Sequence, residues 1–504
     1  MKKLISIMTI VALGGVLFAG QKQTKLITYP APEAEKMAAV SYSVKVNGKS
    51  IDIYKALSPK YNGHEYYFCY FDFEGEVEVE VKSTKQFTQT AGYTEKPRAH
   101  AEADKNYVGE IYPYTIKPIV KERHRMVFRQ DKPFKAIVLR EERGMPLIIF
   151  GNPLEKNVPD KNDPNVIYFG PGVHYKNIIE LKDNQTLYLA GGAVLKGIIR
   201  AKGKNITVRG RGIVSFDNRE RFLGSGIGVH ESENVKIEGI IVKDPCDWCF
   251  LFTNSNNIEM DNVKICGSRM INDDAIAIGN TSNVKIINTF ARAQDDIIPV
   301  KGYYKRGYKA GLKNPDPVKR ESYRPCENIY IDNCILWTDS ANIFRLGYEC
   351  DAPYFKNLVC KNLYIPSFSS VSKLKEYWVR AIFLLQPGNG MPLLDMHFEN
   401  IDIRADGRDF HLIVAESRIV SCGAVRELDH AGEHGAIKNI TFKNINVSGK
   451  KRGNWKGTIY INGQTPEASV ENLKIENVKY FGEKITEKSP CVIIGKNTKN
   501  VSVK

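Results

Sequence analysis

The sequence predicts an all-β protein in which a small antiparallel β-sandwich precedes a long parallel β-helix. Three observations support this prediction: short alternating segments in the first part of the chain, an Asn-rich motif that returns at regular intervals in the rest, and no long amphipathic helical stretch between the repeats. The 504 residues include 22 Phe, 25 Tyr and 42% hydrophobic residues, which is enough for a large core. This composition excludes a wholly disordered or collagen-like chain.

Residues 1–20 have the layout of a secretory signal. Two lysines after Met1 precede an apolar run from Leu4 to Phe18, and polar residues follow Gly20. We therefore expect a signal peptide and a secreted or periplasmic protein. No later segment is apolar for long enough to span a bilayer.

Residues 21–145 are expected to form the β-sandwich. Apolar and polar residues alternate there with a period of two, and turn signals such as Asn47-Gly48 separate the runs, a pattern typical of half-buried antiparallel strands. The alternating segments are 42–46, 51–54, 66–73 and 77–81.

Residues 146–504 are expected to form the β-helix, because a motif of Asn, apolar, polar, apolar, polar and Asn or Gly recurs in them. Most successive starts among the first six lie roughly 20 to 30 residues apart, a spacing typical of a solenoid with short β-rich units. Asn tolerates a left-handed backbone, so it suits the corners of successive coils. A β-propeller is the rival, but its blades need four strands each. The motif starts at Asn205, Asn234, Asn257, Asn283, Asn328, Asn357, Asn439, Asn472 and Asn500.

One longer step, from Asn283 to Asn328, implies an insertion, roughly from Tyr303 to Pro325, that is rich in Lys, Arg, Gly and Tyr. Long loops on a rigid solenoid usually edge a binding face.

Charge and cysteine content limit the classes of partner. Seventy-two Lys and Arg against 57 Asp and Glu give a net charge of +15, which favours an acidic partner such as an acidic polysaccharide. No nucleic-acid reading motif is present, so we expect no nucleic-acid partner. Cys246 and Cys249 form a Cys-x-x-Cys without a second pair, which indicates buried thiols or one local disulfide rather than a metal site.

Two Asp pairs are the strongest chemical signal. Asp273-Asp274 and Asp295-Asp296 lie about one coil apart in the sequence, and each precedes an apolar strand. Stacked coils would gather four carboxylates on one face, where repulsion raises the pKa of at least one of them, as a general acid requires. Glycosidic cleavage needs such a carboxylate pair. A ladder that caps turns or holds calcium is the structural alternative.

Asn272-x-Asp274, followed by Asp295-Asp296 and an apolar strand, resembles the catalytic signature of glycoside hydrolase family 28, the polygalacturonases and their relatives. The resemblance spans roughly residues 160–480 and implies a right-handed β-helix and an inverting hydrolase. It implies Asp295 as general acid, with Asp274 and Asp296 holding and activating the water.

Two departures from the family pattern bear on the substrate. The family's Gly-His-Gly is replaced by the stretch 340–342, which has no His, and its Arg-Ile-Lys has only a partial match at 380–382. The candidate substrate-binding residues are Asp273, Lys301, Arg345 and Arg380. Asp273 is extra relative to the family's Asn-x-Asp-Gly pattern, whereas the three basic residues follow or flank the Asp strands and could bind a uronate carboxylate or sugar hydroxyls.

The sandwich followed by a β-helix also resembles glycoside hydrolase family 49, the dextranases and isopullulanases. That family has a further Asp upstream of the position of Asp273, where this chain has Asn254. Family 28 is therefore the better fit, and a neutral α-glucan remains an alternative substrate.

We expect a monomeric, cofactor-free glycosidase of a polysaccharide or its oligosaccharides, with galacturonan-type pectin as the first candidate. A polysaccharide lyase that uses calcium, and a non-catalytic carbohydrate-binding protein, are the alternatives.

Overall fold

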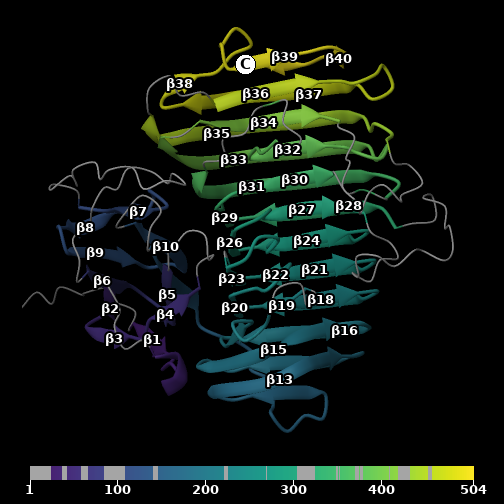
Figure 1. Ribbon diagram of the computed structural model, residues 1–504. Coiled ribbons are helices and arrows are strands. Elements are labelled where there is room, and N and C mark those ends of the chain that lie inside the picture. Colours follow the sequence, from purple (N-terminus) through teal and green to yellow (C-terminus); the bar gives the residue numbers. More distant parts are fainter. Residues whose placement is uncertain are drawn as a thin grey trace, which may run out of the picture.

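The structure, a computed structural model, is built almost wholly from β-strands (Figure 1). It describes residues 24–36, 42–57, 66–83, 108–139, 146–220, 225–267, 269–302, 324–347, 350, 352–368, 374, 379–407, 409–417, 432–451 and 457–504. The expected signal peptide and most of the insertion at 303–325 lie outside these residues. No helix in the described part of the chain is long and apolar enough to cross a membrane.

The N-terminal unit consists of two facing sheets whose apolar side chains share one core. The six-stranded sheet contains β1 (Lys25–Thr28), β4 (Tyr54–Ala56), β5 (Tyr66–Glu74), β7 (Glu110–Tyr112), β10 (Phe134–Leu139) and β11 (Leu147–Pro153). The five-stranded sheet contains β2 (Tyr42–Val46), β3 (Lys49–Ile51), β6 (Val77–Ser83), β8 (Pro118–Lys121) and β9 (Arg125–Gln130). A short 3-10 helix covers Glu33–Glu35.

Strand β11 moves the end of this unit beyond the expected boundary at residue 145. It pairs with β10 and, in parallel, with β5, so the six-stranded sheet ends at Pro153 and the sandwich is not purely antiparallel. Four of its six buried residues, from Leu147 to Phe150, form one apolar run without alternation, which a strand buried on both faces requires.

The expected alternation over residues 66–73 is also wrong, because β5 is buried on both faces. One face, including Phe71, packs in the sandwich core, and the other, including Phe68 and Tyr70, packs on the solenoid. A sheet covered on both sides takes apolar residues at every position.

The rest of the chain is a solenoid of parallel strands that pair with their equivalents in neighbouring coils, apart from one short strand near the C-terminus that pairs antiparallel, so the predicted β-helix is confirmed. The strands of its first half are β12 (Val166–Phe169), β13 (Gly172–Leu181), β14 (Thr186–Leu189), β15 (Ala193–Ala201), β16 (Lys204–Gly210), β17 (Ile213–Ser215), β18 (Ile227–His230), β19 (Glu233–Glu238), β20 (Ile241–Lys243), β21 (Phe250–Thr253), β22 (Asn256–Asp261), β23 (Lys264–Cys266), β24 (Ile276–Gly279), β25 (Ser282–Ile287), β26 (Phe290–Ala293) and β27 (Ile298–Lys301). Those of its second half are β28 (Cys326–Asp332), β29 (Ile335–Thr338), β30 (Phe344–Gly347), β31 (Phe355–Phe368), β32 (Phe383–Gln386), β33 (Leu393–Gly407), β34 (Phe410–Glu416), β35 (Ile437–Lys451), β36 (Gly457–Asn462), β37 (Val470–Tyr480), β38 (Glu483–Lys484), β39 (Val492–Ile494), β40 (Thr498–Lys499) and β41 (Ser502–Val503).

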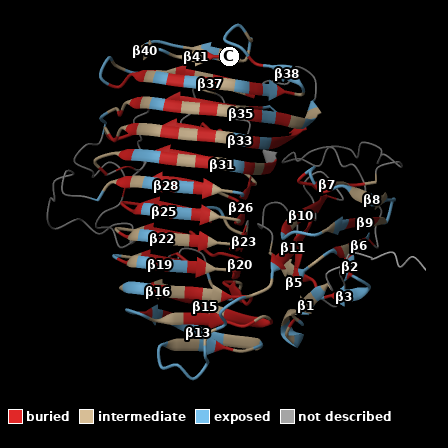
Figure 2. Cartoon of the chain, turned by 180° about the vertical axis from the view of Figure 1, so that it is seen from behind, coloured by how far each residue is buried: buried red, intermediate tan, exposed pale blue. Residues whose placement is uncertain are grey.

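The repeated motif explains the shape of each coil. Its apolar positions point inward and its polar positions outward, which gives the striped strands β19, β22, β25 and β28 of Figure 2. Each leading Asn has a positive φ, for example 58° at Asn234 and 57° at Asn257. The carboxamide of Asn257 donates to that of Asn234 at 2.7 Å, and Asn234 donates to Asn205 at 3.1 Å, so the corners form the expected stack of Asn side chains.

Buried polar contacts and an apolar cluster join the sandwich to the solenoid. Nε of Arg211 donates to both carboxylate oxygens of Asp72, at 2.9 and 2.8 Å, and both side chains are buried. The guanidinium of Arg292 lies between the rings of Tyr66 and Trp337, 4.3 and 4.0 Å from their centroids. The coil that leads into the second Asp pair is therefore braced by the N-terminal unit.

Candidate active site

The register of the solenoid aligns the two Asp pairs. Ile278 of β24 pairs with Val300 of β27, and the same sequence offset separates Asp273 from Asp295 (300 − 278 equals 295 − 273). Asp273 therefore aligns with Asp295 and Asp274 with Asp296 in turns that precede neighbouring parallel strands, about 4.8 Å apart. The predicted gathering of carboxylates is thus present.

Asp273 holds the turn of the next coil. Its Oδ1 accepts hydrogen bonds from the backbone N–H groups of Gln294 and Asp295 at 2.7 and 3.0 Å, and its side chain is fully buried. These contacts position the turn that carries Asp295, and the expected role of Asp273 in substrate binding stays a prediction.

Asp274 is paired with Lys301. Nζ of Lys301 lies 3.1 Å from Oδ2 of Asp274 and 4.0 Å from the centroid of the Trp248 ring, and all three side chains are buried. Burial raises the pKa of Asp274 above its ordinary value and the charges of Asp295 and Asp296 add to this, while Lys301 opposes it. Lys301, which was expected to bind substrate, forms an ion pair with a carboxylate of the site, and its contact with substrate stays a prediction.

Asp296 has donors on both oxygens. Oδ1 accepts the backbone N–H of Asn342 at 3.0 Å and its carboxamide at 2.7 Å, and Oδ2 lies 3.3 Å from a guanidinium nitrogen of Arg345. These three contacts hold the carboxylate of Asp296 in one orientation. Arg345 was also expected to bind substrate, and its contact here is with the site itself.

Asp295 differs from its neighbours because no basic side chain among the described residues forms an ion pair with it. It is partly exposed, and its carboxylate accepts the backbone N–H groups of Asn272 and Asp296 at 3.2 and 2.9 Å. Burial and the negative charge of Asp296 raise its pKa above the ordinary value of an Asp, while the more distant charges of Lys301 and Arg345 oppose this.

Asn342 is a site residue that the sequence reasoning missed. Besides donating to Asp296, its Oδ1 accepts the backbone N–H of Ala381 at 2.8 Å, so it links three successive coils. It lies in the stretch noted for lacking the family's His, and the alignment of β27 with β30 was the signal that could have identified it: Ile298 pairs with Phe344, which places Asn342 next to Asp296.

Arg380 lies one coil further on, beside Ala381, and is partly buried. No ion pair joins it to Asp274, Asp295 or Asp296 in the described structure. The structure therefore brings Lys301 and Arg345 into the Asp cluster and leaves Arg380 at its edge.

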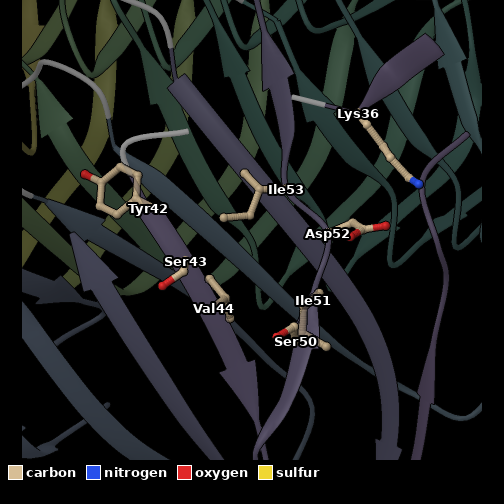
Figure 3. Close-up of a pocket in the computed structure, with 8 residues that line it drawn as sticks. All are labelled: Lys36, Tyr42, Ser43, Val44, Ser50, Ile51, Asp52 and Ile53. Atoms are coloured by element: carbon tan, nitrogen blue, oxygen red, sulfur yellow. The ribbon is translucent and has the colours of Figure 1, made fainter. Parts of the chain in front are cut away.

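The described residues include no group of three His, Cys, Asp or Glu side chains that could hold a metal ion. Cys246 and Cys249 are buried free thiols, which confirms one of the two expected states for this pair. A hollow of about 220 Å³, lined by residues such as Lys36, Ser43 and Asp52, lies in the N-terminal unit and contains none of the Asp cluster (Figure 3).

Comparison with known proteins finds a family match over the part of the chain that contains the Asp pairs. The model of "Glycosyl hydrolases family 28" matches residues 174–309, a segment that contains both Asp pairs and Lys301. Among curated proteins, no sequence matches this chain.

Two solved structures share the fold over almost the whole length. Dex49A from Penicillium minioluteum, of family 49, has a TM-score of 0.64 at 13% identity and covers 93% of this chain and 95% of its own. The family 28 exopolygalacturonase of Yersinia enterocolitica has a TM-score of 0.50 at 13% identity, over 95% of this chain and 96% of its own. The resemblances to both families are thus confirmed, and the family 28 match across the coils that carry both Asp pairs, on a right-handed parallel β-helix, identifies this chain as a glycosidase.

Proposed function

We propose that this chain is an inverting glycoside hydrolase in which Asp295 is the general acid and Asp274 and Asp296 hold and activate the water. The observation that carries this assignment is the distribution of cations. Lys301 pairs with Asp274 and Arg345 pairs with Asp296, whereas no basic side chain in the described structure pairs with Asp295. A carboxyl group that is partly exposed and has no ion-pair partner is the member of the cluster best placed to give a proton to a glycosidic oxygen.

The reaction then follows from the position of each group. Protonated Asp295, the most exposed of the three, donates its proton to the glycosidic oxygen as the bond to the anomeric carbon breaks. A water molecule bound by Asp274 and Asp296 attacks that carbon from the opposite face and gives its proton to one of them. The product is a saturated sugar with inverted configuration, and Asp295 regains its proton from solvent.

Galacturonan-type pectin is the first candidate substrate, supported by the resemblance to family 28 and by the net charge of +15. A neutral α-glucan is the second candidate, and a specific observation favours it. Lys301 and Arg345, which could have bound a uronate carboxylate, are both engaged with carboxylates of the site.

The test is the release of reducing sugar from homogalacturonan, rhamnogalacturonan and dextran, with ultraviolet detection of unsaturated products in parallel. We expect saturated product from one polymer, inverted configuration by NMR, and loss of at least about 100-fold in rate for Asp295→Asn. An unsaturated product would contradict hydrolysis and indicate a lyase reaction. Binding of a polymer without any product would replace hydrolysis by a non-catalytic role.

We also propose that residues 1–20 direct export. Sequencing of the mature N-terminus after expression in a bacterial host tests this, and an intact Met1 in all fractions would contradict it.

A further inference from the structure

Trp248 lies in the coil before the one that carries Asp274, at the position that aligns with this Asp. Phe250 pairs with Ile276, and Trp248 and Asp274 each stand two positions before these paired residues, so Trp248 aligns with Asp274. The backbone N–H of Cys249 donates to the carbonyl oxygen of Asp274 at 2.8 Å, which fixes the two turns on each other. In the coil before Asp274, the aligned position therefore carries an aromatic ring instead of a carboxylate.

The environment of Trp248 makes its ring a platform for a cation. The ring packs with Leu251 and Ala277 in a small apolar cluster on the outer face of the sheet and is 3% exposed. The ammonium of Lys301 lies over it, 4.0 Å from the centroid, and the lysine is itself 6% exposed. Cation–π attraction is strongest for Trp and grows when the pair is desolvated.

We propose that Trp248 and Lys301 are positioning residues that keep Asp274 as the ionised, water-holding carboxylate and thereby leave the proton of the site on Asp295. This inference rests on the proposed function and names the groups that divide the acid and base roles. The ring holds the ammonium from one side, and Oδ2 of Asp274 holds it from the other at 3.1 Å.

The charged groups that face Asp274 determine in which direction its pKa changes when Lys301 is removed. Asp295 and Asp296 raise its pKa together with burial, and Lys301 is the group that lowers it. Arg345 acts on the next carboxylate, Asp296. Without Lys301, Asp274 competes with Asp295 for the proton, and less enzyme has the productive arrangement at acidic pH.

The first test is the pH profile of kcat/KM for Lys301→Met and Lys301→Arg. We expect the methionine variant to lose about 100-fold at pH 6, typical of an impaired general base, and its acidic limb to move up by about one pH unit or more. Lys301→Arg keeps the positive charge over the Trp248 ring. It should restore kcat/KM to within about tenfold of the wild type and return the acidic limb towards its wild-type position. A methionine variant with a normal pH profile, or one that changes KM on galacturonan alone, would overturn the proposal.

An aryl glycoside with a good leaving group separates base from acid, since its cleavage needs little help from Asp295. We expect Lys301→Met to remain as impaired on this substrate as on the polymer, and Asp295→Asn to recover. Recovery of Lys301→Met on the aryl glycoside would show that the lysine does not act through Asp274.

Trp248→Leu should move the acidic limb in the same direction by a smaller amount, and Trp248→Phe by less still. Trp337→Phe is the matched control, because Trp337 also covers a cation, Arg292, at the sandwich interface. The control should change stability and leave the pH profile in place. Equal shifts in the control would refute a specific role of Trp248.

A second measurement does not depend on activity. An ion pair with Asp274 stabilises the fold while the carboxylate is ionised, and this stabilisation is lost as the pH falls through its pKa. The melting temperature of Lys301→Met should therefore fall further below that of the wild type at neutral pH than at low pH. Equal differences at both pH values would overturn the pairing even if no substrate were found, whereas an inactive wild type with the expected difference would overturn only the proposed function.

Discussion

Replacement of Asn342 gives a quantitative test of how the site is held together. In Asn342→Ala, Asp296 loses the carboxamide donor at 2.7 Å but keeps the backbone N–H at 3.0 Å and Arg345. A hydrogen bond to a charged group contributes about 1.5–3 kcal/mol, so kcat/KM should fall by roughly 10- to 100-fold if Asp296 needs that orientation. The backbone N–H of Ala381 also loses its acceptor, which should destabilise the fold by about 1–3 kcal/mol.

Asn342→Asp separates the two effects. Its side chain still accepts from Ala381, so stability should lie closer to that of the wild type. It also places an acidic group within hydrogen-bond distance of Asp296, so the pair must share a proton and the acidic limb of the pH profile should rise. Urea unfolding and kcat/KM from pH 4 to 8 are the assays. If Asn342→Ala lost stability while each folded molecule kept full activity, Asn342 would be structural only and the reasoning would fail.

Three further outcomes follow from contacts elsewhere in the chain. Asp72→Asn removes the ion-pair partner of the buried Arg211 guanidinium and should cost about 3–5 kcal/mol in urea unfolding, and a loss below about 1 kcal/mol would refute the assigned pairing. Asn257→Ala forces a residue that disfavours positive φ to adopt 57° and should cost about 1–2 kcal/mol, which Asn257→Gly should largely recover. Burial and Arg200 lower the pKa of His230 to about 4, so the folded protein keeps this side chain neutral at a free-energy cost that grows as the pH falls from the unfolded pKa towards 4. The stability of His230→Gln should therefore rise relative to the wild type by up to about 3 kcal/mol between pH 7 and 4. Parallel stability curves for the two proteins would contradict this.

The fold was largely predictable from sequence because a solenoid repeats one local rule. The Asn of each corner and the inward apolar positions recur along the solenoid, so the same signal appears many times. The spacing between the two Asp pairs also corresponds directly to the register of β24 on β27. Where contacts depend only on the neighbouring coil, the spacing of residues in the sequence is enough to predict which of them align.

The errors arise where a contact depends on the packing of distant segments. The alternation expected in β5 fails because the solenoid covers the second face of its sheet. Lys301 and Arg345 were placed near the site correctly, but spacing does not show that their charges end on Asp274 and Asp296. Asn342 was hidden because the insertion lengthens the coil that separates β27 from β30, which obscured its alignment with Asp296.

The contacts of the sandwich determine where unfolding of the solenoid can begin. A bare solenoid holds each coil only through its neighbours and can open gradually from either end. Here the N-terminal unit contacts coils from Val173 of β13 to Arg404 of β33, where Arg404 pairs with Glu110, and so joins them into one cooperative block. The coils from β35 to β41 extend past the sandwich (Figure 1), and fraying can begin there while the coils that carry the Asp pairs stay closed.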